Sequence, residues 1–445
     1  MHNLYSNWRI YMKTKATKIE DFVDIFTPFP LKEKNEIDNY FVKTYDARGT
    51  NAISRITFAL NSTRNPFMKI LFMGHRGSGK STELFLLNEM IKSNFEVISF
   101  FIQDEVDVGS MTYIDFIVAI TSQIIKYIEN NDKIELNNSD IDALYNYWRE
   151  EKIIEETDTD SLEGTLDFSG KLSFLKHLML KCSGILQTGS ESKITIRKKI
   201  EPKIGFLIQL LNQVIAKINE QLIGNNGLIF IIEDLDKLTL PVATELFITH
   251  RKVVFSIKTK MILTFPIFMA YDAQYNMIKE DIDICQMLSI IKVKDKNGEN
   301  FYKGINTLKE IVYKRTEHSL IDEDALQFAI MKSGGAIRDL FQIIRESAFE
   351  AMEAGHFKIE LEDVKNSYKR LKSEYERLIR TEEDVRKLKQ IYNDPKLLTS
   401  DETLMSLLLR GLVLEYNGER WCGIHPAIED FLCEKGEINV KQSTN

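Results

Sequence analysis

The chain carries, between two apolar segments, the stretch Gly74-His75-Arg76-Gly77-Ser78-Gly79-Lys80-Ser81, which matches the pattern G-x-x-x-x-G-K-[ST]. The apolar run 70–73 precedes it directly, and a segment with helical periodicity at 83–90 follows it. A loop of this composition works in this context because successive backbone N–H groups at a helix N-terminus can surround a phosphate group. The sequence therefore predicts a phosphate-binding loop between a buried strand and a helix.

Each residue type in this stretch has a physical role. The glycines let the backbone approach a phosphate closely, Lys80 can reach the β- and γ-phosphates, and the Ser81 hydroxyl can bind Mg²⁺. The alternative is a chance glycine-rich turn, but both flanks and all constrained positions match the motif. The sequence therefore predicts that a nucleoside triphosphate binds at Gly74, His75, Arg76, Gly77, Ser78, Gly79, Lys80, Ser81 and Thr82.

The composition is that of an ordinary globular protein. The 445 residues suffice for about two to four domains. The net charge of −8 argues against a surface that is basic throughout, although a local basic patch could still bind nucleic acid. The four cysteines are scattered without metal-ligand spacing, and we find neither a signal peptide nor an apolar run of roughly 20 residues. We therefore expect a cytoplasmic protein with reduced thiols and no membrane segment.

Short apolar runs of strand length alternate with helical segments around and after the loop. Fully apolar strands that alternate with helices are typical of a parallel sheet covered on both faces. We therefore predict an α/β fold with a P-loop parallel sheet of about five strands, at 70–73, 97–102, 228–232, 261–266 and 288–293.

The remaining segments extend this core. Amphipathic helices joined by short loops follow the fifth predicted strand and indicate a small helical bundle, which we call the lid. The stretch of sequence between the second and third predicted strands is far longer than a minimal α/β unit needs, and this length indicates an insertion. The predicted domains are an N-terminal segment (1–48), a nucleotide-binding core (49–300) with an insertion at about 130–200, the helical lid (301–375) and a winged-helix domain (376–445).

The region of the insertion carries two opposed charge runs. An acidic, poorly periodic stretch covers 150–160, and the basic triplet Arg197-Lys198-Lys199 opens the helical run that returns to the core. We interpret both runs as solvated faces, and a regulatory contact between them is the alternative.

The last segment predicts a helix followed by a β-hairpin. Asn417-Gly418 lies between two alternating runs, and this pair favours a type I′ turn because both positions need a positive φ. A helix followed by such a hairpin indicates a winged-helix module. Residues 395–445 contain five basic and eight acidic side chains and so carry a net charge of −3. A DNA-reading helix normally brings Lys or Arg to the phosphates. We therefore expect this module to contact a protein partner and do not favour nucleic acid.

A second nucleotide motif comes at the end of the third predicted strand. Residues 228–232 are wholly apolar and are followed by Glu233-Asp234-Leu235-Asp236. Carboxylates directly after a buried strand are positioned to hold Mg²⁺ and to orient an attacking water molecule, although a helix N-cap is the alternative, above all for Asp236. We predict Glu233 and Asp234 as metal-binding and catalytic residues.

These two motifs resemble those of the AAA+ and STAND class of ATPases, in particular origin-recognition-complex-type AAA+ proteins and bacterial STAND-like ATPases. The resemblance covers roughly residues 45–370 and implies ATP and Mg²⁺ as ligands. That family usually places Asp first at the strand end, followed by the catalytic carboxylate. Here Glu233 takes the metal position and Asp234 the base position, and the longer Glu could slow hydrolysis.

The resemblance also implies sensor residues. The segment 333–340 looks like the sensor-2 segment of this family, in which an Arg on a lid helix reaches the γ-phosphate; Arg338 would take this role, and a solvated Arg is the alternative. Thr264 lies where the family keeps a polar sensor-1 residue, but a core threonine fits equally well. Arg251 and Arg315 are candidates for an arginine finger from a neighbouring subunit.

Together these features predict an ATP-hydrolysing molecular switch with Lys80, Glu233, Asp234 and Arg338 as catalytic residues and Ser81 as a further Mg²⁺ ligand. The family resemblance favours a prokaryotic regulatory or anti-phage defence ATPase that acts through self-assembly or a partner protein. A DNA-loading initiator and a non-hydrolysing, ATP-bound scaffold remain the alternatives.

Overall fold

The computed structural model describes residues 15–131, 134, 136, 138–150, 167–188, 191–222, 225–396, 401–416 and 421–439. Its internal contacts divide the chain into two compact units. The sheet unit consists of Ile56–Met73 and Leu86–Gln286, and the lid unit of Met1–Arg55, Gly74–Phe85 and Met287–Asn445. Both boundaries at which the chain passes from the lid unit into the sheet unit fall within a helix: the first within α5 (Ala52–Ser62) and the second within α6 (Lys80–Ile91).

The sheet unit is built on a five-stranded sheet with the order β2-β3-β4-β1-β5. The pairs β1–β4, β3–β4 and β2–β3 are parallel. Every residue of β1, β3 and β4 is buried, which explains why the interiors of these strands are mostly apolar and do not alternate with polar residues. The predicted α/β class and four of the predicted strands are confirmed. The strands are β1 (Lys69–Met73), β2 (Glu96–Phe101), β3 (Leu228–Glu233), β4 (Lys260–Phe265) and β5 (Ile284–Met287).

The prediction of the fifth strand at 288–293 is wrong. The strand β5 ends at Met287, and the apolar residues after it are buried in the core of the lid unit. Ile291 and Val293 pack among the lid helices, and Ile290 packs with Ala336 and Leu414. A short apolar run signals burial, but it does not say whether the buried segment is a strand.

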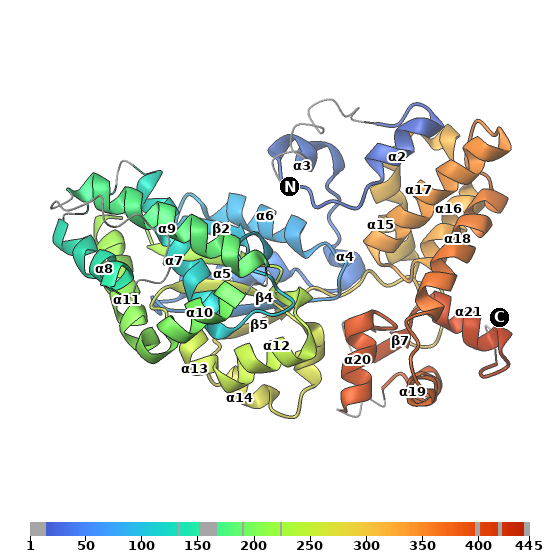
Figure 1. Cartoon of the computed structure of the whole chain (residues 1–445). Helices are drawn as coiled ribbons and strands as arrows, with labels where there is room; N and C mark the ends of the chain where they lie inside the picture. The colour runs from blue at the N-terminus through green and yellow to red at the C-terminus, as the bar shows by residue number, and fades with distance from the viewer. Residues whose placement is uncertain are drawn as a thin grey trace. The chain divides into compact units, whose positions relative to one another are not determined.

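Helices surround this sheet, and part of them form the predicted insertion. Helix α9 contacts both α7 and α8, and α8 also contacts α11 (Figure 1). The acidic stretch predicted at 150–160 lies outside the described residues after Glu150, the last residue of α8. The long helices are α7 (Tyr113–Glu129), α8 (Asn138–Glu150), α9 (Phe168–Thr188), α10 (Glu191–Ile200) and α11 (Ile204–Gln221). Shorter elements are η2 (Ile102–Asp104), η4 (Glu201–Lys203), η5 (Leu235–Lys237), α12 (Leu240–Thr244), the π-helix η6 (Glu245–Thr249), α13 (Arg251–Val254), η7 (Ile267–Tyr271) and α14 (Tyr275–Lys279).

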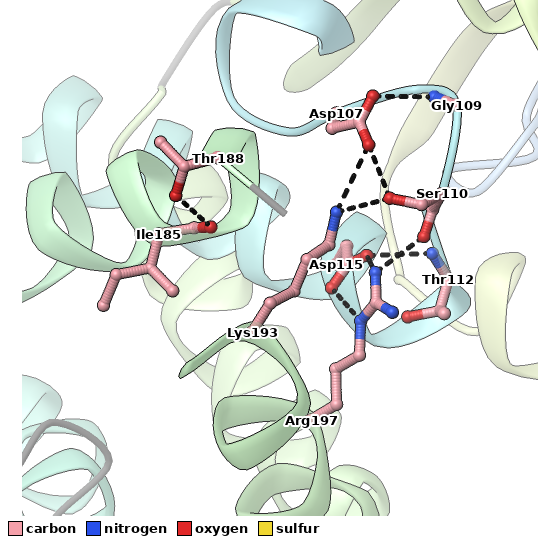
Figure 2. Close-up of polar contacts among 9 residues, drawn as sticks. All are labelled: Asp107, Gly109, Ser110, Thr112, Asp115, Ile185, Thr188, Lys193 and Arg197. Carbon is pink, nitrogen blue, oxygen red and sulfur yellow. Dashed lines mark hydrogen bonds and ion pairs between the residues drawn. The ribbon is translucent and has the colours of Figure 1, made fainter. Parts of the chain in front are cut away.

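Two basic side chains of α10 fasten this helix to the loop before α7 (Figure 2). Lys193 Nζ donates to Ser110 Oγ at 2.7 Å and lies 3.7 Å from Asp107 Oδ2. Arg197 donates to the carboxylate of Asp115, which is completely buried, and to the Ser110 carbonyl oxygen. The interpretation of the basic triplet as a solvated face is therefore wrong for Arg197, because its charge neutralises a buried carboxylate.

Replacing Arg197 with Met is expected to weaken the docking of α10 by about 3 kcal/mol, because the buried Asp115 carboxylate then loses its ion-pair partner. Hydrogen exchange of the α10 amides measures this effect locally, which suits a chain that need not unfold in a single step. The exposed neighbour Lys198 provides the control, and Lys198→Met should leave the exchange unchanged. Equal exchange in the two variants would show that the ion pair contributes little.

The lid unit contains the predicted helical bundle, and α17 packs against both α18 and α16 (Figure 1). The N-terminal segment packs onto it, because α2 contacts α17 and the Phe26 ring meets the Phe341 ring edge-on. The bundle consists of α15 (Tyr302–Tyr313), α16 (Glu323–Lys332), α17 (Ile337–Ala354) and α18 (Leu361–Glu376). The shorter elements are η1 (Ile19–Asp21), α2 (Phe22–Ile25), α3 (Lys34–Tyr40), α4 (Tyr45–Arg48) and η8 (His318–Leu320).

The chain after the bundle forms what we call the C-terminal module: α19 (Glu382–Asn393), α20 (Glu402–Arg410), β6 (Val413–Tyr416), β7 (Trp421–Ile424) and α21 (Pro426–Glu434). The predicted helix and antiparallel hairpin are both present, whereas the turn residues 417–420 lie outside the described part. The identification as a winged-helix domain stays a prediction, as do the other domain boundaries.

All four cysteines are free thiols. None of the helices in the described part of the chain is both long and apolar enough to cross a membrane.

Candidate nucleotide-binding site

The phosphate loop has the predicted surroundings. The buried strand β1 ends at Met73, and α6 begins at Lys80. Between them, Gly77 and Gly79 adopt φ values of +81° and +96°, a region that side-chain-bearing residues rarely adopt. The glycines of the motif are therefore required by the backbone, and the predicted strand–loop–helix is confirmed.

The structure brings Arg338 to the phosphate loop. Arg338 lies in the first turn of α17, and a Cβ atom on Gly77 would lie only 2.7 Å from the Arg338 Cβ atom. Both residues belong to the lid unit, so the loop and the predicted sensor segment are direct neighbours. The predicted proximity of Arg338 to the loop is thereby seen in the structure, while its role towards a γ-phosphate stays a prediction.

Replacing Gly77 with Ala is expected to destabilise the lid unit by about 2–3 kcal/mol, from left-handed strain plus the displacement of α17. The matched control is Gly355→Ala, since Gly355 has a φ of +75° but no atom within 4 Å of an added Cβ. That control should cost only about 1 kcal/mol of strain. Hydrogen exchange of the α17 amides in both variants measures the difference, and equal exchange would mean that the contact with Arg338 is not tight.

The Lys80 ammonium group lies against the backbone of the loop. Its Nζ atom donates to the carbonyl oxygens of Gly74 and His75, each at 2.8 Å, and the side chain is 7% exposed. A buried ammonium group surrounded by a glycine-rich backbone is suited to bind an anion that approaches the helix N-terminus. The position of Lys80 therefore agrees with its predicted contact with phosphate.

Sequence reasoning missed a second cation beside this loop. Arg48 is 1% exposed; its Nη2 atom donates to the Ser78 carbonyl oxygen at 2.6 Å, and its Nε atom donates to Thr44 Oγ1 at 2.7 Å. A third donation, to the Ser289 carbonyl oxygen, links the loop to the segment after β5. Burial lowers the pKa of Arg48 to about 10, an effect that the nearby Glu83 carboxylate opposes. Arg48 therefore fastens the loop from the side of the N-terminal segment.

The other loop side chains differ in their surroundings. Arg76 is exposed, and the Thr82 hydroxyl accepts a hydrogen bond from the Leu31 N–H group at 3.1 Å. His75 is 3% exposed, and its Nε2 atom accepts a hydrogen bond of 2.7 Å from the Glu415 N–H group in β6. The side chains of Thr82 and His75 thus form hydrogen bonds with other segments of the lid unit. We therefore expect these two residues to contact a nucleotide only through their backbone atoms.

The two predicted carboxylates lie at one edge of the sheet. Glu233 is the last residue of β3 and is 6% exposed, and Asp234 follows it at 5% exposed. Since β1 and β3 both run parallel to β4, which lies between them, Glu233 lies at the same edge of the sheet as Met73, the last residue before the phosphate loop. The two carboxylates therefore follow the sheet at the edge where β1 also ends.

Asp234 has a strained backbone and an unusual environment. Its φ of +70° is the only positive value at a non-glycine residue in the described part of the chain. Oδ1 pairs with Lys237 Nζ at 2.8 Å, whereas the buried Oδ2 atom has no hydrogen-bond partner there. Burial raises the pKa of Asp234, and Lys237 opposes this rise. Strain of this kind concentrates at functional sites, because the surrounding structure must maintain it.

The donor set fits Mg²⁺ bound together with a nucleotide. Mg²⁺ takes one or two carboxylates and completes its shell with water and phosphate oxygens. No group of three or more His, Cys, Asp or Glu side chains suited to hold a metal occurs among the described residues, and such a group is not needed here. Glu233 and Asp234, whose Oδ2 atom has no hydrogen-bond partner among the described residues, are the residues of the sheet unit that would hold the ion.

Three further candidates can be judged from their contacts. Thr264 Oγ1 accepts from the Leu235 N–H group at 3.0 Å, so Thr264 supports the turn after β3. Arg315 is 6% exposed and stacks on Tyr40 and Phe341 inside its own unit, so the prediction of Arg315 as an arginine finger is wrong. Arg251 pairs with Asp281 and Glu280 of its own chain.

Comparison with known proteins gives fold similarities at low identity. A Walker-type ATPase of Pyrococcus abyssi is 14% identical with a TM-score of 0.45, over 92% of this chain and 99% of the other. The ORC2 protein of Aeropyrum pernix is 11% identical with a TM-score of 0.43, over 93% and 98%. The RuvB Holliday-junction branch-migration motor of Thermotoga maritima is 12% identical with a TM-score of 0.37, over 92% and 99%. Similarity at this level does not transfer an activity.

The sequence matches no protein-family model and no curated protein. The strand order, the loop between β1 and α6, and the helices around the sheet together constitute an α/β P-loop fold.

Proposed function

We propose that this protein is a molecular switch that binds and hydrolyses ATP. The observation that carries the proposal is the phosphate loop itself. It joins a fully buried strand to a helix, its glycines occupy left-handed backbone conformations, and the ammonium group of Lys80 lies within its backbone. In the proposed complex the loop N–H groups and Lys80 bind the β- and γ-phosphates, and Ser81 contributes its hydroxyl group to Mg²⁺.

Glu233 and Asp234 would supply the carboxylates of the reaction. The bound Mg²⁺ would neutralise charge on the β- and γ-phosphates. Glu233 would orient the ion, and Asp234 would hold the attacking water and accept its proton. A carboxylate with an unmatched, buried oxygen atom is suited to this work, because its lone pairs are not already used by other donors. The reversed order of the two acids makes slow hydrolysis the expectation.

Arg338 would make the position of the lid helix α17 depend on the γ-phosphate. Its guanidinium group carries a fixed positive charge on the first turn of α17, next to Gly77. Attraction to a γ-phosphate would hold α17 at the loop, and hydrolysis would remove that attraction. The lid would thus distinguish ATP from ADP, which is what a nucleotide switch requires.

For the output of the switch we favour self-assembly or a protein partner, in a prokaryotic regulatory or anti-phage defence role. The C-terminal segment 395–445 has a formal charge of −3, which disfavours a phosphate backbone as its target. A DNA-loading initiator is the alternative. Duplex DNA should therefore leave the ATPase rate unchanged at low salt, and a stimulation that disappears steeply with added salt would favour the initiator.

Steady-state phosphate release tests the enzymatic part of the proposal. The full chain with Mg²⁺ and ATP should release phosphate continuously, and omission of Mg²⁺ should abolish the release. ATP binding without any release would instead identify a non-hydrolysing scaffold, a function with which the Glu at the metal position is compatible. The molecular mass with and without a non-hydrolysable ATP analogue, measured alongside, shows whether nucleotide drives assembly.

A further inference from the structure

The side chain of His75 connects the phosphate loop to the C-terminal module. Its Nε2 atom accepts a hydrogen bond of 2.7 Å from the backbone N–H group of Glu415, a residue 340 positions away in β6. Both groups are buried, and both belong to the lid unit. No function assigned so far to the loop requires this contact, because phosphate is bound by the backbone of the loop and by Lys80.

The contact depends on a neutral imidazole ring. Burial and the Lys80 charge lower the pKa of His75 to about 3, so the ring is uncharged near neutral pH. Since Nε2 accepts the hydrogen bond, the ring proton resides on Nδ1. If the imidazole were replaced by an apolar group, the Glu415 N–H group would remain buried without an acceptor, and this penalty opposes docking of the hairpin.

The same module packs tightly on the segment that leads to Arg338. A Cβ atom on Gly334 would lie 2.8 Å from Pro426 Cδ and 3.0 Å from Leu414 Cδ1. Tyr416 donates its hydroxyl hydrogen to the Gly334 carbonyl oxygen at 2.9 Å. The hairpin side chains also share an apolar cluster with this segment, formed by Ile290, Ala336, Leu414, Tyr416 and Trp421.

A further contact lies directly after Arg338. The Oδ2 atom of Asp339 is 3.1 Å from His425 Nε2 and accepts a hydrogen bond of 2.7 Å from Tyr375. His425 Nδ1 accepts from the Ala427 N–H group, so Nε2 carries the ring proton and donates it to Asp339. The C-terminal module therefore contacts both elements that the proposed function assigns to the phosphates: the loop through His75, and the residues on each side of Arg338.

We propose that His75 couples nucleotide binding at the phosphate loop to docking of the C-terminal hairpin, a form of regulation that rests on the proposed function. The loop in its left-handed, phosphate-binding form is the form that holds the Glu415 N–H group. Lys80 lies between the two sites, because its ammonium group donates to the His75 carbonyl oxygen and can also reach a phosphate bound at the loop. A nucleotide that fixes this loop form stabilises docking, and docking raises nucleotide affinity by the same factor.

The variant His75→Ala tests the coupling with two measurements on the full chain. Hydrogen exchange of the β6 peptide should accelerate in the variant, and added Mg²⁺·ATP analogue should protect this peptide in the wild type but much less in the variant. Nucleotide affinity, measured by calorimetry, should fall on the order of tenfold. The variant His75→Gln, whose amide oxygen can accept the same hydrogen bond, should restore a large part of both signals.

A second variant weakens docking without touching the phosphate loop. Tyr416→Phe removes only the hydrogen bond to Gly334, and it should also lower nucleotide affinity, by a smaller factor. Unchanged hairpin exchange in His75→Ala, or reduced affinity without a change in that exchange, overturns the coupling while nucleotide binding stands. A wild-type chain that binds no nucleotide overturns the proposed function and the coupling together.

Discussion

Replacing Lys80 with Ala is expected to lower the affinity for Mg²⁺·ATP by about 100-fold or more, because truncating one partner of a buried, hydrogen-bonded charge pair costs 2–5 kcal/mol. The Lys80 side chain is 7% exposed and is already held by two loop carbonyl groups, so little conformational freedom is lost when it turns to a phosphate. Calorimetric titration of both proteins measures the ratio of dissociation constants.

The control for this variant lies just beyond the same helix. Lys92 follows the end of α6, its side chain is 57% exposed, and it pairs with Glu89 at the surface. Surface ion pairs contribute about 0–1 kcal/mol, so Lys92→Ala should bind nucleotide like the wild type. Wild-type affinity in a folded Lys80→Ala protein would show that the ammonium group does not contact the phosphates.

Replacing Asp234 with Asn is expected to reduce the rate of phosphate release by about 100- to 1000-fold, because general bases contribute factors of this size, while ATP affinity stays within a few-fold. Asn has nearly the same shape and tolerates the left-handed conformation at φ +70°, so the backbone of the turn is maintained. Because burial raises the pKa of Asp234, the wild-type rate should fall with decreasing pH sooner than it would for an exposed aspartate.

The variant Glu233→Gln distinguishes the two carboxylates. If Glu233 is the principal Mg²⁺ ligand, this variant should need a higher Mg²⁺ concentration for half-maximal activity, and Asp234→Asn should raise that concentration much less. Asp236→Asn, on the same turn but not assigned to the site, is the control. If Asp234→Asn raised the Mg²⁺ requirement and Glu233→Gln reduced the rate of phosphate release instead, Glu233 would be the base. Full activity in both variants would show that neither carboxylate takes part in the mechanism.

The parts of this account that rest on local signals were predictable from the sequence. The phosphate loop, the acids after β3, the lid helices and the hairpin each follow from the order of neighbouring residues, since glycine content, apolar runs and periodicity act over a few positions. The fifth strand could not be placed in this way, because Ile290, Ile291 and Val293 are buried against lid helices and the C-terminal hairpin and carry the same apolar signal as a strand.

Contacts between residues far apart in the sequence could not be predicted from local sequence patterns. Arg48 reaches Ser289 across 241 positions, and His75 reaches Glu415 across 340. The residues next to Arg48 and His75 in the sequence give no sign of these contacts. The left-handed conformation of Asp234 is likewise imposed by its surroundings, since Thr264 on the neighbouring strand holds the next N–H group. Such features follow from the assembled fold and not from any stretch of sequence.

We expect the loop after β1 to bind the polyphosphate of a magnesium nucleotide. The decisive experiment is isothermal titration of Mg²⁺·ATP into the full-length, folded chain. The titration should give a saturable heat with one nucleotide bound per chain, and Lys80→Ala should abolish or greatly weaken this heat. A folded wild-type chain that gives no binding heat at several temperatures would contradict this expectation.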